Sequence, residues 1–169
     1  MNEPIPHYLL FSEARRDGRD GRWRFVRRPT DGSPELEVFD AEPHTHGERL
    51  ELLAVVRGLE SLDQPSRVTL LTTSRYVRRG IRYGLAQWRA DDWRWERFGV
   101  MVPVKNGDLW QRLDRAMQYH RVDCHTWRID SAACRGAKRA DGGRGRGLAD
   151  RFRDAVGRCF QPPSPALAG

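Results

Sequence analysis

Arginine-rich segments are the parts of this sequence most suited to binding chemistry. Between residues 135 and 158, eight basic residues stand against three aspartates. The run Gly-Gly-Arg-Gly-Arg-Gly within this segment contains Arg144 and Arg146, whose guanidinium groups could follow a phosphate backbone. A solvated, disordered loop has the same composition. The segment therefore predicts phosphate binding and leaves a soluble loop as the alternative.

The charge of the whole chain favours a polyanionic partner. The formal net charge is +7, the isoelectric point is about 10.0, and only Lys105 and Lys138 among the 30 basic residues are lysines. A GC-rich genome would explain arginine in place of lysine, but it does not explain the positive balance. Basic proteins bind nucleic acid because contacts to phosphates release condensed counterions.

Cysteine and histidine usage gives little support for a metal centre or disulfides. The three cysteines are an odd number without regular spacing, which argues against a disulfide framework. His120, Cys124, His125 and Cys134 could be grouped as zinc ligands, but their spacing matches no compact zinc pattern.

Length and hydropathy indicate one domain over residues 1–160, followed by a Pro-rich tail over 161–169. No run of about 18 apolar residues is present, so we expect no membrane span. The N-terminus lacks the charged start and cleavage site of a signal peptide, and we expect a cytoplasmic protein.

The elements that must position these residues alternate between strands and helices. Three short strands separated by turn clusters predict an antiparallel meander, and the later strands follow helices, as in a parallel crossover. The order is βββαβααβα, which predicts an α/β fold with a five-stranded mixed sheet flanked by helices. The expected strands cover residues 7–13, 22–28, 36–39, 68–71 and 122–129, and the expected helices cover 47–62, 74–89, 108–120 and 148–160.

Three segments resemble the ribonuclease H family. Residues 48–54 (ERLELLA) match the family's N-R-M-E-L-x-A helix start. Residues 71–81 match T-D-S-x-Y-V-x-x-G-I, and residues 103–114 match V-K-N-x-D-L-W. The likeness runs from about Tyr8 to Phe160 and follows the same order of elements. The resemblance implies a ribonuclease H-like fold with three antiparallel and two parallel strands.

The resemblance also implies a reaction. The family cuts the RNA strand of an RNA–DNA hybrid with four carboxylates around two Mg²⁺ ions. Here Glu51 and Asp150 match two of the carboxylates, and Glu13 stands in place of the first-strand aspartate. Thr73 stands where the family has the aspartate that ends its fourth strand. The remaining metal ligands would be Glu13, Glu51 and Asp150, so we expect Mg²⁺ binding to be weak or absent.

The residues that read the hybrid depart from the family pattern as well. The paired asparagines before the helix are replaced by Gly47 and Glu48, and a glutamine is replaced by Arg75. No histidine occurs in the loop over residues 131–136, where the family has one. Trp88 and Trp110 match aromatic core positions, and Asn106 is expected to cap a helix. The candidate nucleic-acid contacts are Arg75, Arg94, Arg97, Lys105, Arg144 and Arg146.

Three functions are consistent with this sequence. The first is a monomeric ribonuclease H-like protein that binds hybrid or duplex nucleic acid and is inactive or strongly impaired in cleavage. The second is a metal-dependent ribonuclease with altered geometry that uses Glu13, Glu51 and Asp150. The third is a protein-interaction module that has kept only the scaffold.

Overall fold

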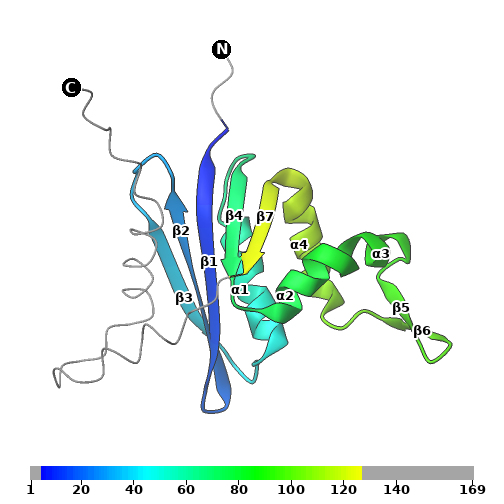
Figure 1. Cartoon of the computed structure of the whole chain (residues 1–169). Coiled ribbons are helices and arrows are strands. Elements are labelled where there is room, and N and C mark those ends of the chain that lie inside the picture. Colours follow the sequence, from blue (N-terminus) through cyan, green and yellow to red (C-terminus); the bar gives the residue numbers. More distant parts are fainter. Residues whose placement is uncertain (1–4, 127–169) are drawn as a thin grey trace, which may run out of the picture. The chain divides into compact units, whose positions relative to one another are not determined.

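The computed structural model describes residues 5–126, which fold around a five-stranded sheet with the order β3-β2-β1-β4-β7 (Figure 1). The antiparallel half contains β1 (His7–Asp17), β2 (Asp20–Pro29) and β3 (Leu36–Glu42). β1 and β2 meet at a tight turn in which Gly18 has a φ of 62°, a conformation that glycine adopts readily. The strand expected over residues 7–13 is longer than predicted, because β1 continues to Asp17 and Ala14 pairs with the buried Trp23.

The parallel half of the sheet adds β4 (Arg67–Thr72) beside β1 and β7 (Arg121–Thr126) beside β4. In this register Ser12 of β1 lies opposite Thr72 of β4. The predicted mixed sheet, with three antiparallel strands and two parallel additions, is therefore confirmed. The register therefore places the end of β4 beside the middle of β1, which continues to Asp17.

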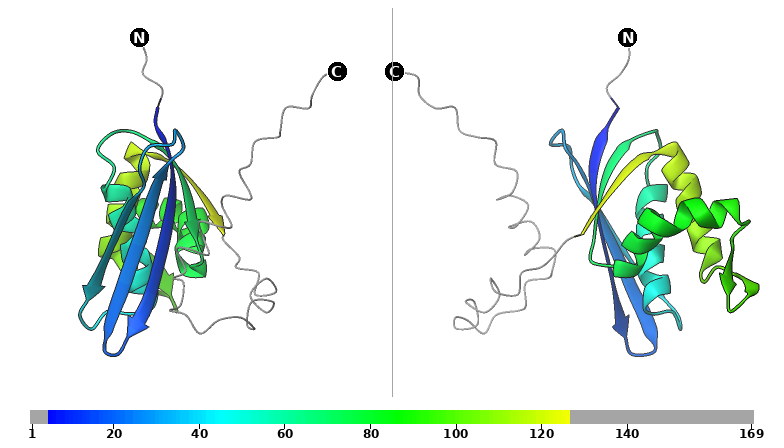
Figure 2. Two further views of the ribbon diagram at one scale, coloured as in Figure 1. Left: turned by 90° about the vertical axis from the view of Figure 1, so that its left-hand side faces the viewer. Right: turned by 45° about the vertical axis from the view of Figure 1, so that its right-hand side comes forward.

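Two long helices, α1 (Glu48–Glu60) and α4 (Gly107–Tyr119), pack against each other on one face of this sheet (Figure 2). Two ion pairs join the ends of α1 to the first half of α4: Arg49 to Asp108 and Arg112 to Glu60, each at 2.7 Å. Their apolar faces and the facing strand residues form the core. Its largest fully buried side chains include Leu10, Leu50, Leu52, Leu59, Leu70, Leu109, Trp110 and Leu113.

The helix expected over residues 74–89 is divided into three parts. α2 (Arg75–Arg79) continues into a π-helical turn, η1 (Gly80–Gly84), and then into α3 (Leu85–Ala90). A Cβ atom on Gly80 would lie 2.1 Å from the Trp110 ring, so only glycine permits this close approach. Trp110 is fully buried and its ring lies 5.1 Å from that of Trp88, which confirms the predicted aromatic packing.

The segment 91–104, which the sequence predicted as a connection, contains a second, two-stranded sheet. β5 (Arg94–Arg97) and β6 (Val100–Pro103) form an antiparallel hairpin that projects from the helical side (Figure 1). Its base is held by hydrogen bonds from Trp93 N to Trp88 O at 2.7 Å and from Val104 N to Trp93 O at 2.9 Å. The sequence pattern predicted no strand in this connection, so the hairpin was missed.

Several predictions lie outside the described residues. These are the loop over 135–147, the helix over 148–160, the tail over 161–169, Arg144, Arg146 and Asp150. Within residues 5–126, none of the helices combines the length and the apolar character that crossing a bilayer requires.

Candidate functional site

The end of β4 and the adjacent middle part of β1, called the sheet edge below, carry two of the predicted site residues. Glu13 and Thr73 directly follow Ser12 and Thr72, which lie opposite each other in the parallel register. The Glu13 residue is half-buried, whereas Thr73 is exposed. The cross-strand neighbour of Glu13 is Arg24, whose Nε forms an ion pair with Glu37 at 3.2 Å. The structure thus places Glu13 within β1 and Thr73 just after β4, each one residue beyond the last β1–β4 pair.

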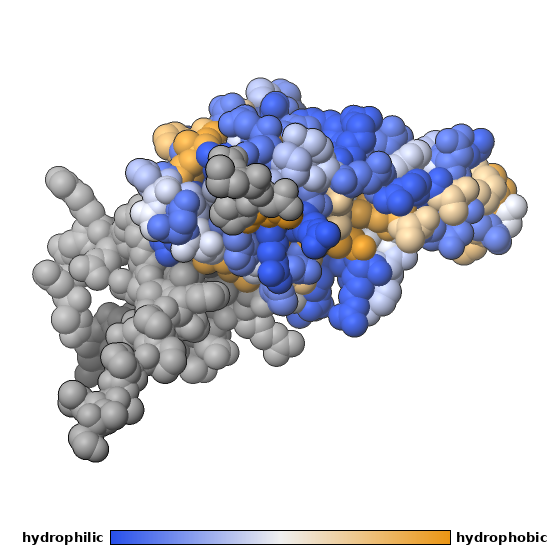
Figure 3. Space-filling model, turned by 90° about the horizontal axis from the view of Figure 1, so that it is seen from above, coloured by the Kyte–Doolittle hydropathy of each residue, from blue (hydrophilic) through white to orange (hydrophobic). Residues whose placement is uncertain are grey.

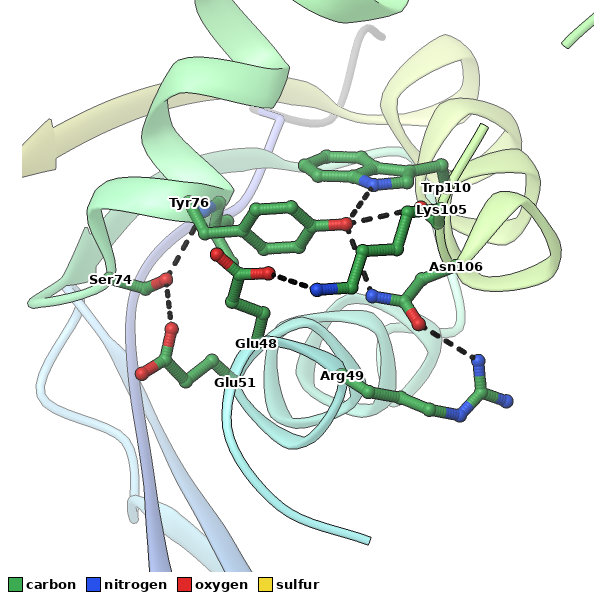
Figure 4. Close-up of polar contacts among 9 residues, drawn as sticks. Glu48, Arg49, Glu51, Ser74, Tyr76, Lys105, Asn106 and Trp110 are labelled. Carbon is green, nitrogen blue, oxygen red and sulfur yellow. Dashed lines mark hydrogen bonds and ion pairs between the residues drawn. The ribbon is translucent and has the colours of Figure 1, made fainter. Parts of the chain in front are cut away.

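Glu51 lies in the first turn of α1 and is fixed by a hydroxyl from the same strand edge (Figure 4). Ser74 Oγ donates a short hydrogen bond to Glu51 Oε2 and accepts one from Val77 N at 3.2 Å. Ser74 N in turn donates to Thr72 Oγ1 at 3.1 Å. Ser74 is thus the N-cap of α2, and the same hydroxyl also orients the Glu51 carboxylate.

The donor set at this edge is poor in carboxylates. A magnesium ion requires several hard oxygen ligands in near-octahedral geometry. The described chain offers Glu13 and Glu51 here, and the intervening position holds the neutral hydroxyl of Thr73. In residues 5–126 there is no group of three or more histidine, cysteine, aspartate or glutamate side chains able to hold a metal ion. Within residues 5–126, Glu13 and Glu51 are thus the two predicted carboxylate ligands at this place, and the third, Asp150, lies outside the described residues.

Beside this edge, Lys105 is bound to a carboxylate of α1. Its Nζ lies 2.7 Å from Glu48 Oε2, as Figure 4 shows, and this hydrogen bond raises the pKa of Lys105 above its ordinary value. Lys105 was predicted to contact nucleic acid. A phosphate that approached it would have to compete with the Glu48 carboxylate.

The hydroxyl of Tyr76 connects α2 with the start of α4 (Figure 4). It accepts hydrogen bonds from Trp110 Nε1 at 2.8 Å and from Asn106 Nδ2 at 3.1 Å, and it donates to the carbonyl of Lys105 at 3.1 Å. Asn106 occupies the N-cap position with a φ of 57°, but its side chain caps no backbone N–H. The expected side-chain cap at Asn106 is therefore wrong, because the amide binds Tyr76 instead.

Arg49 completes the link between α1 and α4. Its guanidinium forms two hydrogen bonds with Asp108, at 2.7 and 2.9 Å, and approaches Asn106 Oδ1 at 3.5 Å. The hydrogen bonds from Arg49 lower the pKa of Asp108 and raise that of Arg49 itself. A paired guanidinium of this kind holds the helix ends in place rather than remaining available to a ligand.

A row of arginines leads away from Thr73 along α2 and η1. Arg75, Arg79 and Arg82 are exposed: the first two lie four residues apart on one face of α2, and Arg82 follows in η1. Of the carboxylates in residues 5–126, none forms an ion pair with them. Arg75 was a predicted contact; Arg79 and Arg82 were missed, although their spacing is visible in the sequence.

The two predicted contacts on the hairpin are also exposed. Arg94 Nη2 donates to the carbonyl of Met101 at 2.9 Å, and the Arg97 guanidinium lies 5.8 Å from the centre of the Phe98 ring. Apart from Lys105, the predicted site residues within residues 5–126 thus lie in two places. Glu13, Glu51 and Arg75 belong to the sheet edge, whereas Arg94 and Arg97 belong to the hairpin.

Comparison with known proteins defines the class to which this fold and strand edge belong. Residues 13–142 match the ribonuclease H family. A ribonuclease H of Rhodopirellula baltica is 42% identical over 105 residues, which are 62% of this chain and 66% of that protein. A ribonuclease H of Cupriavidus necator is 35% identical over 149 residues, 88% of this chain and 97% of its own length. The chain belongs to the ribonuclease H family.

Solved structures agree on the fold. The crystal structure of LC9-RNase H1, described as a type 1 enzyme with the type 2 active-site motif, has a TM-score of 0.62 and 21% identity. The match covers 99% of this chain and 96% of that one. LC11-RNase H1, solved in complex with an RNA/DNA hybrid, has a TM-score of 0.53 and 12% identity over 75% and 89% of the two chains. The predicted ribonuclease H-like fold is confirmed.

Proposed function

We propose that this protein is a nucleic-acid-binding member of the ribonuclease H family whose cleavage of RNA–DNA hybrids is strongly impaired. The observation that carries the proposal is the combination at one sheet edge: Thr73 replaces a carboxylate, and an exposed arginine row begins two residues later. Compared with the family pattern, this edge offers fewer carboxylates that could bind cations and more guanidinium groups that could bind phosphates.

The arginine row supports binding to a nucleic-acid backbone. Phosphates of one strand follow each other at a regular spacing, and guanidinium groups that follow each other along α2 and η1 without an acidic partner in residues 5–126 can contact several of them. Each neutralised phosphate releases counterions, so the affinity should fall steeply with salt. Hybrid and duplex DNA should bind similarly, because the family's amides that read 2′-hydroxyls are absent at Gly47 and Glu48.

The loss of one carboxylate affects hydrolysis more than binding. In the family reaction, two Mg²⁺ ions activate the attacking water and stabilise the leaving oxygen when they are bound. Glu13, Glu51 and Asp150 would be the residues left to hold them. Glu13 carries its carboxylate one methylene further from the strand than an aspartate would, and Thr73 contributes no charge. Catalytic geometry tolerates little displacement, so these changes together favour a strongly impaired site.

A metal-dependent nuclease of altered geometry is the second candidate. The observation in its favour is the hydrogen bond from Ser74 Oγ, which keeps Glu51 oriented even though Thr73 has lost the carboxylate. In this candidate Glu13 and Glu51 act together with Asp150. The two candidates differ in whether the unmodified protein cleaves a hybrid.

Cleavage of one labelled hybrid in Mg²⁺ separates the two. We expect no cleavage by the unmodified protein and at most a trace by Thr73→Asp, which restores a charge but leaves Glu13 too long. Adding Glu13→Asp should raise cleavage beyond the combined effects of the single changes, since metal ligands act as a unit. Robust cleavage by the unmodified protein, together with its loss in Glu51→Gln, would contradict this proposal and support the nuclease of altered geometry.

Binding is tested by fluorescence anisotropy with hybrid, duplex DNA and duplex RNA across a range of salt concentrations. A triple substitution of the arginine row to glutamine should reduce the affinity for all three and lower the salt slope by about three, about 0.9 for each lost phosphate contact. The control is a second triple variant that loses the same charge elsewhere on the surface. Its three exposed positions, changed to glutamine, are Arg57, Arg115 and Arg121. Equal losses by both triple variants would refute a localised interface.

A further inference from the structure

The tip of the β5–β6 hairpin displays a phenylalanine in a backbone conformation that phenylalanine avoids. Arg97 pairs with Val100, so Phe98 and Gly99 form a two-residue loop. Their φ angles are 51° and 77°, both in the left-handed region. Such loops favour Asn-Gly, because asparagine and glycine tolerate this conformation and larger side chains do not. The ring at the tip is therefore present despite the local backbone preference.

The same tip is the most exposed apolar surface on this part of the chain. The Phe98 residue is 94% exposed, and Trp95, Val100 and Met101 around it are 45%, 60% and 42% exposed. Figure 3 shows this surface as pale orange and orange atoms at the right-hand end of the molecule. An exposed apolar cluster of this kind usually marks a binding site.

Positive charge accompanies the rings. The guanidinium of Arg97 lies 5.8 Å from the centre of the Phe98 ring, and the hairpin also carries Arg94. Glu96 is the single acidic residue of the two strands and their loop. A ring with flanking guanidinium groups suits a flat, electron-rich partner attached to a phosphate, which describes a nucleotide with an unpaired base.

We propose that the β5–β6 hairpin binds unpaired nucleobases by stacking on Phe98 and Trp95, with Arg94 and Arg97 contacting the adjacent phosphates. This deepens the proposed function, on which it rests, by adding single-stranded nucleic acid next to the duplex. A fully paired duplex presents its bases stacked on one another, so a protruding ring gains little from it. A strand that continues beyond the duplex end offers free base faces at the hairpin.

The base of the hairpin supports this function mechanically. The backbone hydrogen bonds between Trp93, Trp88 and Val104 hold the strands to α3 and to the start of α4. Arg94 bridges the two strands through the Met101 carbonyl. A hairpin fixed at its base presents its tip in one position, so stacking requires less ordering of the protein.

The test compares a blunt 12-base-pair RNA–DNA hybrid with the same hybrid carrying a five-thymidine DNA extension, at either end, by fluorescence anisotropy. Stacking contributes enough per base for the extended probe to bind about tenfold more tightly to the unmodified protein. Phe98→Ala should abolish this advantage and leave the affinity for the blunt hybrid unchanged. Phe98→Trp should retain it.

Two further variants separate a binding role from a structural one. Phe98→Asn should lose the advantage while the melting temperature stays equal or rises, because asparagine suits the left-handed position. Phe39→Ala removes a phenylalanine that is 76% exposed on β3 and should change neither affinity.

Three results would overturn the proposal: equal binding of blunt and extended probes by the unmodified protein, an equal loss for both probes in Phe98→Ala, or a Phe98→Ala effect confined to self-association measured by light scattering. If the blunt hybrid does not bind at all, but the extension alone binds in a Phe98-dependent way, the proposed duplex function fails and the hairpin inference stands.

Discussion

Replacing Tyr76 by phenylalanine tests whether the hydrogen bonds of its hydroxyl stabilise the fold. The substitution keeps the ring, which packs 5.3 Å from that of Trp110, and removes only the oxygen. The indole N–H of Trp110 would lose its partner inside a fully buried side chain. An unsatisfied buried donor costs about 1–3 kcal/mol. The groups at Asn106 and Lys105 lie nearer the surface, where water can replace the hydroxyl.

The expected result is therefore a decrease of about 2 kcal/mol in the free energy of unfolding, measured by urea denaturation with linear extrapolation. Tyr83→Phe is the matched control, because this residue is 69% exposed and water can reach its hydroxyl. We expect the control to change stability by less than about 0.5 kcal/mol.

The reasoning also requires that the cost depends on the indole. In a Trp110→Phe background, where no N–H is left unsatisfied, Tyr76→Phe should cost less than about 0.5 kcal/mol. If Tyr76→Phe costs as much in that background as in the unmodified protein, the hydrogen bond is not the cause. If Tyr76→Phe lowers the free energy of unfolding of the otherwise unmodified protein by less than about 0.5 kcal/mol, the hydroxyl does not stabilise the fold as argued.

Two further predictions concern charge. Glu48→Gln should release Lys105, raise the affinity for duplex nucleic acid and steepen the salt dependence by about one phosphate contact, measured by anisotropy; a similar gain when Lys105 is also changed to alanine would contradict this. Burial lowers the pKa of His120 below its ordinary value of 6.5, so the unfolded chain binds more protons between these two values. Stability should therefore decrease as pH falls below about 6.5, and urea denaturation at several pH values should show a smaller decrease for His120→Gln but not for the exposed His46→Gln.

Much of the fold could be predicted because its signals are local. Alternating apolar residues such as Trp23 and Phe25 mark a strand with one buried face, and the apolar stripe of residues 50–59 marks a helix. The order of strands and helices then restricts the sheet to few topologies. Ser74 could be predicted as an N-cap for the same reason, since capping involves residues three positions apart.

The hairpin at residues 94–103 could not be predicted in this way. Its turn is Phe98-Gly99 rather than Asn-Gly, and its first strand alternates charged residues with a tryptophan. The π-helical turn at Gly80–Gly84 was missed because it depends on the contact between Gly80 and Trp110, which are far apart in the sequence. Local patterns carry no information on such contacts.

The side chains that the site residues contact could not be predicted from the sequence either. Lys105 and Glu48 are 57 residues apart, and Tyr76 and Trp110 are 34 apart, so only the packing of α2 and α4 against α1 brings them together. The sequence indicated which residues carry charge, but it did not indicate which charges are already neutralised. The arginine row, in contrast, was missed although its spacing of four and three residues is visible in the sequence.

Taken together, the substitutions at this sheet edge redistribute charge. Compared with the family pattern, Thr73 removes a negative charge where β4 ends, and Glu48 places one against Lys105 at the start of α1. Arg75 adds a positive charge beside Thr73. We expect the first change to weaken cation binding at the sheet edge, the second to weaken anion binding at Lys105, and the third to strengthen anion binding along α2. We infer that a bound phosphate backbone follows the row from Arg75 to Arg82 more closely than it approaches Lys105.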